Sequence, residues 1–199
     1  MIQCRKTGLY SGVVRLVLPD PAESALPLPI EKHCADSLAE AGYTESSFPR
    51  ESIAEISRFS VSKEYKLRCA RSTDFIKAVG NDSEGATLQK DEVDKRMVPH
   101  ITLGLFAGVL RMSLENNITH WLAVMEPTLI RFLTRFGVYF QPVGEPVEYH
   151  GVRQPAIAKV DEVLTTIFNS RRDVWDLVTD NGRLYPVPAM PEVSVNYGG

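Results

Sequence analysis

The sequence has few cysteines, no long apolar run and no excess of charge of one sign. Its three cysteines, Cys4, Cys34 and Cys69, lie far apart and form no CxxC pair, so they indicate neither a disulfide framework nor a cysteine-based metal site. No apolar segment approaches the roughly 20 residues that cross a bilayer, and no signal-type stretch follows the first residues. We therefore expect a cytoplasmic protein without a membrane span.

The balance of charge also limits the possible partners. The 22 Lys and Arg residues against 25 Asp and Glu residues give a net charge of −3, which argues against a general nucleic-acid binder. With 44% hydrophobic and 24% charged residues, the chain is too apolar to be disordered. Its length predicts one domain at residues 1–183, followed by a proline-containing tail at 184–199.

Hydrophobic periodicity predicts a chain of mixed α/β (α+β) class. Strands are expected in a hairpin within 2–18, at 53–61, 120–125 and 138–143, and in a second hairpin within 145–160. Helices are expected at 30–41, 69–79, 101–117, 127–136, 161–169 and 171–179. The proline-rich segment 19–52 is expected to run over the surface as a long connection, and the polar segment 62–99 to be largely a mobile loop. This order predicts a sheet of mixed direction with helices packed on it.

Glu55–Phe59, with the sequence Glu-Ile-Ser-Arg-Phe at the end of a predicted strand, resembles a motif of the acyl-homoserine-lactone synthases. Val14–Leu16 and Leu129–Gly137 are similar to further segments of those enzymes. The wider stretches 53–66 and 105–151 look more like long-chain N-acyl amino acid synthases and exosortase-associated acyltransferases. The resemblance implies the fold of the GCN5-related N-acyltransferases: a mixed, mostly antiparallel central sheet flanked by helices, with a bulged central strand.

This resemblance implies transfer of an acyl group from a thioester to an amine. A base must remove a proton from the amine, and Glu55, directly or through a water molecule, is the candidate. Strict alternation places Phe59 on the face of Glu55 and Arg58 on the opposite one, so a bulge is needed for Glu55 and Arg58 to serve one cleft. The same bulge frees a backbone N–H near Ser57 for the developing oxyanion.

Arg15 and Arg58 match arginine positions of the homoserine-lactone synthases. One of them could hold the acceptor carboxylate as a bidentate pair while the other orients Glu55. The alternative is an ion pair between Glu55 and an arginine that only joins adjacent strands, because such networks are common in sheets.

The acyl donor is predicted from a missing motif. CoA-using relatives bind the diphosphate in a glycine-containing loop after the central strand, whereas 66–71 contains no glycine. We therefore expect the acyl-phosphopantetheine arm of an acyl carrier protein as donor, with no bound cofactor. Four basic side chains either contact this acidic partner or form a solvated face: Lys63, Lys66, Arg68 and Arg71.

The acyl chain needs an apolar slot, although apolar residues at strand or helix spacing are packing residues first. The candidates are Phe59, Leu103, Phe106, Leu110, Leu122, Val124 and Phe132. Homoserine-lactone synthases carry a strand and helices before the hairpin that begins this chain, so either the chain is truncated or the acceptor pocket comes from 19–52 and 62–99. Aromatic residues in or beside these segments favour a tyrosine-like amino acid as acceptor: Tyr10, Tyr43, Phe48 and Tyr65.

Two other functions stay open. One is an acyl-homoserine-lactone synthase that uses S-adenosylmethionine, and the other is a catalytically silent sensor that binds acyl carrier protein. A serine hydrolase is disfavoured, because Ser57 lies in no Gly-x-Ser-x-Gly turn. No metal site is predicted, because the four histidines lack ligand spacing: His33, His100, His120 and His150.

Overall fold

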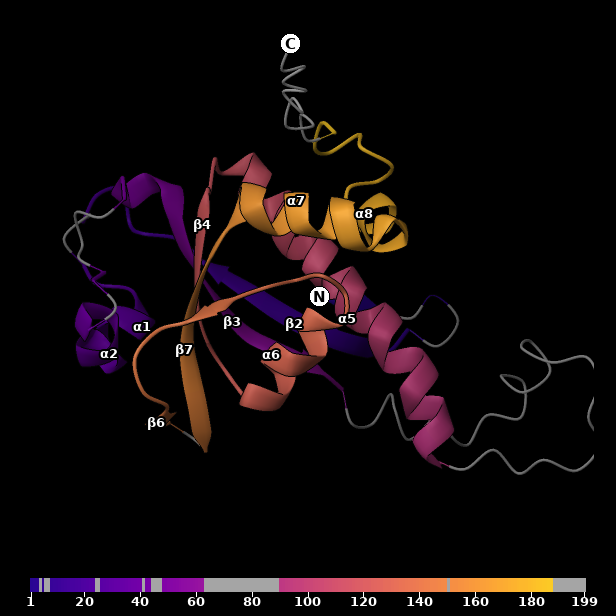
Figure 1. Ribbon diagram of the computed structural model, residues 1–199, viewed down its shortest axis with the longest axis horizontal. Coiled ribbons are helices and arrows are strands. Elements are labelled where there is room, and N and C mark those ends of the chain that lie inside the picture. Colours follow the sequence, from indigo (N-terminus) through magenta and orange to yellow (C-terminus); the bar gives the residue numbers. More distant parts are fainter. Residues whose placement is uncertain are drawn as a thin grey trace, which may run out of the picture.

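A seven-stranded sheet organises the chain in the computed structural model (Figure 1). The structure describes residues 1–3, 5, 8–23, 26–40, 42–43, 48–62, 90–149 and 151–187, with the backbone alone at 90–99. The expected helix at 69–79 lies outside this set. None of the described helices is long and apolar enough to span a membrane.

The strands follow the predicted order along the chain. They are β1 (Ile2–Gln3), β2 (Tyr10–Val17), β3 (Ile53–Val61), β4 (His120–Met125), β5 (Gln141–Pro142), β6 (Val147–Glu148) and β7 (Val152–Lys159). In space the order is β1-β2-β3-β4-β7-β5, with β6 also paired to β7. Within the described sheet only β3 and β4 run parallel, so the mixed, mostly antiparallel arrangement is confirmed.

The helices agree with the periodicity in most places. They are α1 (Pro29–His33), α2 (Ala35–Glu40), a 3₁₀ turn (Arg50–Ser52), α5 (Lys90–Glu115), α6 (Pro127–Thr134), α7 (Val160–Ser170) and α8 (Arg172–Val178). As predicted, α6 has a proline at its start, and Gly137, with φ of 78°, follows its last turn.

Three predicted boundaries were wrong. The single helix expected at 30–41 is divided at Cys34, whose φ of −131° and ψ of 29° are not helical. Helix α5 begins at Lys90 rather than 101, inside the stretch that polarity had assigned to a loop. The strand expected at 138–143 is reduced to Gln141–Pro142, although the N–H of Val143 still donates to the carbonyl of Pro155 at 2.9 Å.

Two hydrophobic cores lie on opposite faces of the sheet. Helices α5, α7 and α8 cover one face, where Phe106, Trp121 and Trp175 are buried. Helices α1 and α2 cover the other face, where Ile30 and Leu122 are buried (Figure 1). Consecutive residues of β4 therefore point to different cores, which is the alternation expected of a strand buried on both sides.

Within the proline-rich segment 19–52, the described residues 28–40 form a packed layer and not a surface connection. Proline is tolerated at the first position of a helix, and Pro29 stands there in α1. The apolar residues between the prolines then pack against the sheet, with Leu28, Ile30 and Leu38 all buried. At the other end of the chain, Tyr185, in the segment expected to be a tail, packs partly against the main core.

Candidate functional site

Strands β3 and β4 separate after a short parallel ladder. Their pairing covers only 53–56 of β3 with 120–123 of β4, whereas β4 stays paired with β7 as far as Met125. A cavity of about 780 Å³ opens at this point, lined by both strands, α1 and α6. This volume is in the range of about 300–1,000 Å³ typical of small-molecule sites.

A bulge in β3 lies beside the cavity. The ladder between β2 and β3 shifts by one residue between Val13 and Arg15, and Arg58 opposite this shift has a positive φ of 54°. The shift changes which way the following side chains point. Phe59 consequently packs against the core of α5, α7 and α8, which corrects its predicted placement on the face of Glu55. The predicted bulge itself is confirmed.

Glu55 is a nearly buried carboxylate that lines the cavity, with 6% of its surface exposed. Its Oε2 accepts a hydrogen bond of 2.7 Å from the backbone N–H of Ile30, whereas Oε1 has no partner among the described residues. Burial raises the pKa of Glu55, and the nearby charge of Glu31 adds to the rise; the Ile30 bond and the positive charge of Arg15 oppose it without cancelling it. A carboxyl with a raised pKa is suited to accept and release a proton near neutral pH.

The two motif arginines line the same cavity but do not bind Glu55. Arg15 donates from Nε to the hydroxyl of Ser57 at 3.0 Å. No ion pair joins Glu55 to either Arg15 or Arg58 within the described part of the chain, so a strand-joining ion pair is not what holds this carboxylate. The guanidinium groups are therefore placed to attract an anionic ligand.

Sequence reasoning missed the residues that close the cavity from the side of α1 and the β6–β7 hairpin. The rings of His33 and Tyr149 pack with centroids 4.9 Å apart at an angle of 31°. Arg153 of β7 forms an ion pair of 3.3 Å with Glu126. All four residues line the cavity, and no local pattern marks them because they meet only through tertiary packing.

Cys34 also lines the cavity, and 3% of its surface is exposed. Burial raises the pKa of its thiol, and the negative charge of Glu55 raises it further. The thiol therefore stays protonated at neutral pH and is a poor nucleophile.

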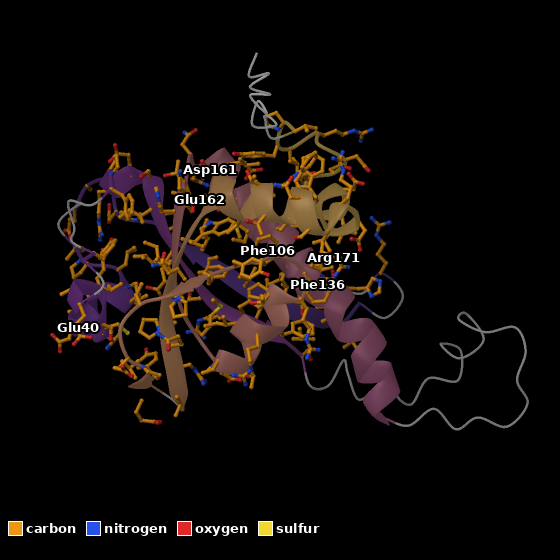
Figure 2. The ribbon with its side chains drawn as sticks, in the orientation of Figure 1. Glu40, Phe106, Phe136, Asp161, Glu162 and Arg171 are labelled. Carbon is orange, nitrogen blue, oxygen red and sulfur yellow. The ribbon has the colours of Figure 1, made fainter. Side chains whose placement is uncertain are left out.

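The structure brings together some of the predicted site residues and separates others. The residues that line the cavity are Arg15, Glu55, Ser57, Arg58, Phe59, Val124 and Phe132. The residues that instead lie in the cores are Leu103, Phe106, Leu110 and Leu122. Figure 2 shows Phe106 inside the fold, where the apolar face of α5 meets the sheet. Lys63, Lys66, Arg68 and Arg71 are outside the described residues.

The aromatic residues expected at the acceptor pocket also lie elsewhere. Tyr43 is buried with its hydroxyl on Glu31, and Phe48 stacks on His120 at 3.8 Å between centroids. Tyr10 is 57% exposed, and Tyr65 is not described. Among the described residues, no group of three or more His, Cys, Asp or Glu side chains is placed to hold a metal ion.

Replacing Arg58 by glycine or by alanine is expected to distinguish the effect of its backbone conformation on stability from the effect of its guanidinium on activity. An L-residue with positive φ is disfavoured, so the glycine variant should be about 1 kcal/mol more stable than the alanine variant. Urea denaturation measures this difference. Both variants lose the guanidinium and should lose activity to the same extent; equal stabilities would show that the backbone at Arg58 is not strained.

Comparison with known proteins gives a match of fold. No protein-family model matches the sequence, and no curated protein matches it significantly. FeeM, an N-acyl amino acid synthase from uncultured soil microbes, superposes with a TM-score of 0.50 and 15% identity over 81% of this chain and 67% of FeeM. BjaI is a CoA-dependent acyl-homoserine lactone synthase solved with SAM and isopentyl-CoA. It superposes with a TM-score of 0.50 and 17% sequence identity over 92% of this chain and 66% of BjaI.

The chain thus has the fold of the acyl-homoserine-lactone synthases and of an N-acyl amino acid synthase, as the motif in β3 predicted. It spans about two thirds of the length of these enzymes, 67% of FeeM and 66% of BjaI.

Proposed function

We propose that this chain is an N-acyltransferase that moves a long-chain fatty acyl group from the thioester of an acyl carrier protein to the amino group of an amino acid. The observation that carries the proposal is the buried Glu55 carboxylate in the cavity where β3 and β4 separate, with Oε2 held by Ile30 and Oε1 without a partner in the described part of the chain. The shared fold supports acyl transfer as the reaction class.

In the proposed reaction the acceptor amine attacks the thioester carbonyl carbon. The nitrogen gives its electron pair to the new C–N bond and its proton to Glu55, directly or through water. Beyond Ile56, β3 has no ladder with β4, so backbone donors on this edge can stabilise the oxyanion of the tetrahedral intermediate. Collapse of that intermediate breaks the C–S bond, and the sulfur leaves as a thiol with the proton that Glu55 accepted, which restores the carboxylate.

The acceptor proposed here is an amino acid with a free carboxylate and an aromatic side chain. The guanidinium of Arg58, which has no ion-pair partner among the described residues, or that of Arg15, suits the carboxylate as a bidentate ligand. The tilted, adjacent rings of His33 and Tyr149 provide an aromatic wall in the same cavity. These contacts support a tyrosine-like acceptor.

The carrier-protein donor is supported by a basic surface on α6. Arg131 and Arg135 are exposed, lie one helical turn apart and form no ion pair with any described residue. Arg171, whose charge is paired with Asp173 at 2.8 Å, lies next to Arg135, because it donates to the carbonyl of Arg135 at 2.8 Å and its guanidinium lies 5.7 Å from the ring centroid of Phe136 (Figure 2). Phe132, on the same helix, lines the cavity, so an acidic carrier bound here could deliver its acyl chain to it.

Lipid extracts from cells that express the chain should contain a new long-chain N-acyl amino acid. Mass spectrometry identifies the acceptor and the chain length together. The lipid should be absent with Glu55→Gln and present with Glu162→Gln, an exposed carboxylate on α7 that serves as the matched control.

An acyl-homoserine lactone would instead indicate the S-adenosylmethionine reaction. Carrier binding without any product would indicate the silent sensor, and equal rates with acyl-CoA would contradict the carrier as the donor.

A further inference from the structure

Two carboxylates, those of Glu55 and Glu31, accept hydrogen bonds from backbone N–H groups at the start of α1. Oε2 of Glu55 accepts from the N–H of Ile30 at 2.7 Å, and Oε2 of Glu31 accepts from the N–H of Leu28 at 2.6 Å. The first N–H groups of a helix have no partner inside the helix, so each bond satisfies a buried donor. The orientation of Glu55 is therefore tied to the position of α1.

Glu31 is locked in place by a second set of contacts. Its Oε1 accepts from the hydroxyl of Tyr43 at 2.9 Å and from Nη1 of Arg50 at 2.6 Å. The other terminal nitrogen of Arg50 donates to the carbonyl of Leu26 at 2.6 Å. Burial alone would raise the pKa of Glu31, but the bonds from Arg50, Leu28 and Tyr43 together hold it below its ordinary value. Glu31 therefore stays ionised and paired at neutral pH.

We infer that Glu31 and Arg50 are positioning residues for Glu55: their buried ion pair fixes the start of α1, so that the Ile30 N–H holds one oxygen of Glu55 and leaves the other for the acceptor amine. The inference rests on the proposed function, in which Glu55 is the base. Neither Glu31 nor Arg50 lines the cavity, so both act through α1.

The chain connectivity explains why this ion pair acts on Glu55. Arg50 stands in the 3₁₀ turn that leads directly into β3, the strand that carries Glu55. The Arg50–Glu31 pair and the Ile30–Glu55 bond thus join the same two segments twice, and loss of either contact removes a polar restraint on α1 while the apolar packing of Ile30 remains. A shift of about 1 Å at a catalytic group can cost up to 100-fold in rate.

Arg50→Met is the variant that tests this inference. Loss of the ion pair should weaken the Ile30 bond, which favours the ionised form, so the pKa of Glu55 should rise further. Without Arg50, the negative charge of Glu31, which raises the pKa of Glu55, is also no longer neutralised by its ion pair, so both effects have the same sign. Carboxyl ¹³C NMR of labelled glutamate, assigned with Glu55→Gln, measures this pKa without any turnover.

Kinetics provides the second measurement. We expect kcat to fall about 10- to 100-fold while KM for the acceptor changes by less than about threefold, because the binding residues are untouched. The acidic limb of the pH profile should move to higher pH. Arg50→Lys, which keeps the charge, should recover part of kcat, and Arg183→Met, at an exposed arginine paired with Asp180, is the matched control.

Other charged and titratable groups surround Glu55 and are the same in wild type and variant. They are Arg15 from β2, Glu31, His33 and Cys34 from the α1 segment, Arg58 from β3, Glu126 from the end of β4, and Tyr149 and Arg153 from the hairpin. A change in the pKa of Glu55 is therefore attributable to the lost arginine and its effect on α1.

A lower melting temperature with unchanged Glu55 pKa and kcat would overturn the inference and leave the ion pair a purely structural contact. If Arg50→Met does not fold, Tyr43→Phe removes one bond to Glu31 and should produce the same shifts to a smaller extent. Absence of turnover in the wild type would contradict the proposed function, whereas the NMR titration would still decide whether the ion pair controls Glu55.

Discussion

Glu55→Gln is expected to lower kcat by about 10²- to 10⁴-fold, the usual contribution of a general base. Glutamine keeps the shape of the side chain, and its amide oxygen can still accept from the Ile30 N–H, so the fold should persist. Single-turnover measurements with purified protein separate this loss from slow product release. An unchanged rate would contradict Glu55 as the base.

The same variant is expected to change the pH dependence of stability. Because the pKa of Glu55 is raised in the folded state, protonation favours folding: the associated stability is complete below the unfolded-state pKa and is lost as the pH rises through the folded-state value. Because glutamine does not ionise, Glu55→Gln does not lose this stability as the pH rises. The variant should therefore gain stability relative to the wild type as the pH rises from the unfolded-state pKa of about 4 through the higher folded-state value.

Urea denaturation at several pH values measures this gain. The difference in free energy of unfolding between variant and wild type isolates Glu55 from the other titrating groups. A difference that falls with rising pH would mean that the carboxylate is stabilised in the fold, contrary to its burial.

Gly144→Ala is expected to have the largest effect on stability. A Cβ at this position would lie 2.5 Å from Cα and Cβ of Ser37 in α2, and the backbone has a positive φ of 58°. The clash involves backbone as well as side-chain atoms, so α2 or the strand connection must move. We expect a loss of about 3 kcal/mol in the free energy of unfolding.

Gly42→Ala is the matched control for this variant. Gly42 also has a positive φ, of 75°, but nothing lies within 4 Å of its added Cβ. It should therefore lose only the conformational part, about 1 kcal/mol. Because α2 follows α1 directly, Gly144→Ala should lower activity as well, whereas Gly42→Ala should not. Equal losses of stability at the two positions would contradict the close packing of α2 against Gly144.

Much of the fold could be predicted because its signals are local. Strands β3 and β4 have the predicted bounds, since runs of alternating or apolar residues report strand length without knowledge of the neighbours. Helix α6 was predicted from Pro127 and Gly137, which act through their own backbone angles. The start of α5 was missed because its first turns are polar and carry no helical periodicity.

The motif residues of the candidate site could be predicted from the sequence, whereas most of the other residues that line the cavity could not. Glu55, Arg58 and Arg15 were found from short patterns, and all three line the cavity. The acyl-slot candidates divided between cavity and core, because an apolar side chain at regular spacing looks the same in both settings. His33 and Tyr149 were missed, since they are more than a hundred residues apart and meet only in the folded chain.

The sequence alone therefore determined the class of fold, the order of its strands and helices and the strand that carries the candidate base. The tertiary structure decided where β3 and β4 separate, which side Phe59 takes after the bulge, and that a proline-rich segment forms a helical layer whose Ile30 N–H binds Glu55. The reason is physical: propensity and periodicity act over a few residues, whereas cavities, burial and raised pKa values arise from groups that only the completed packing brings together.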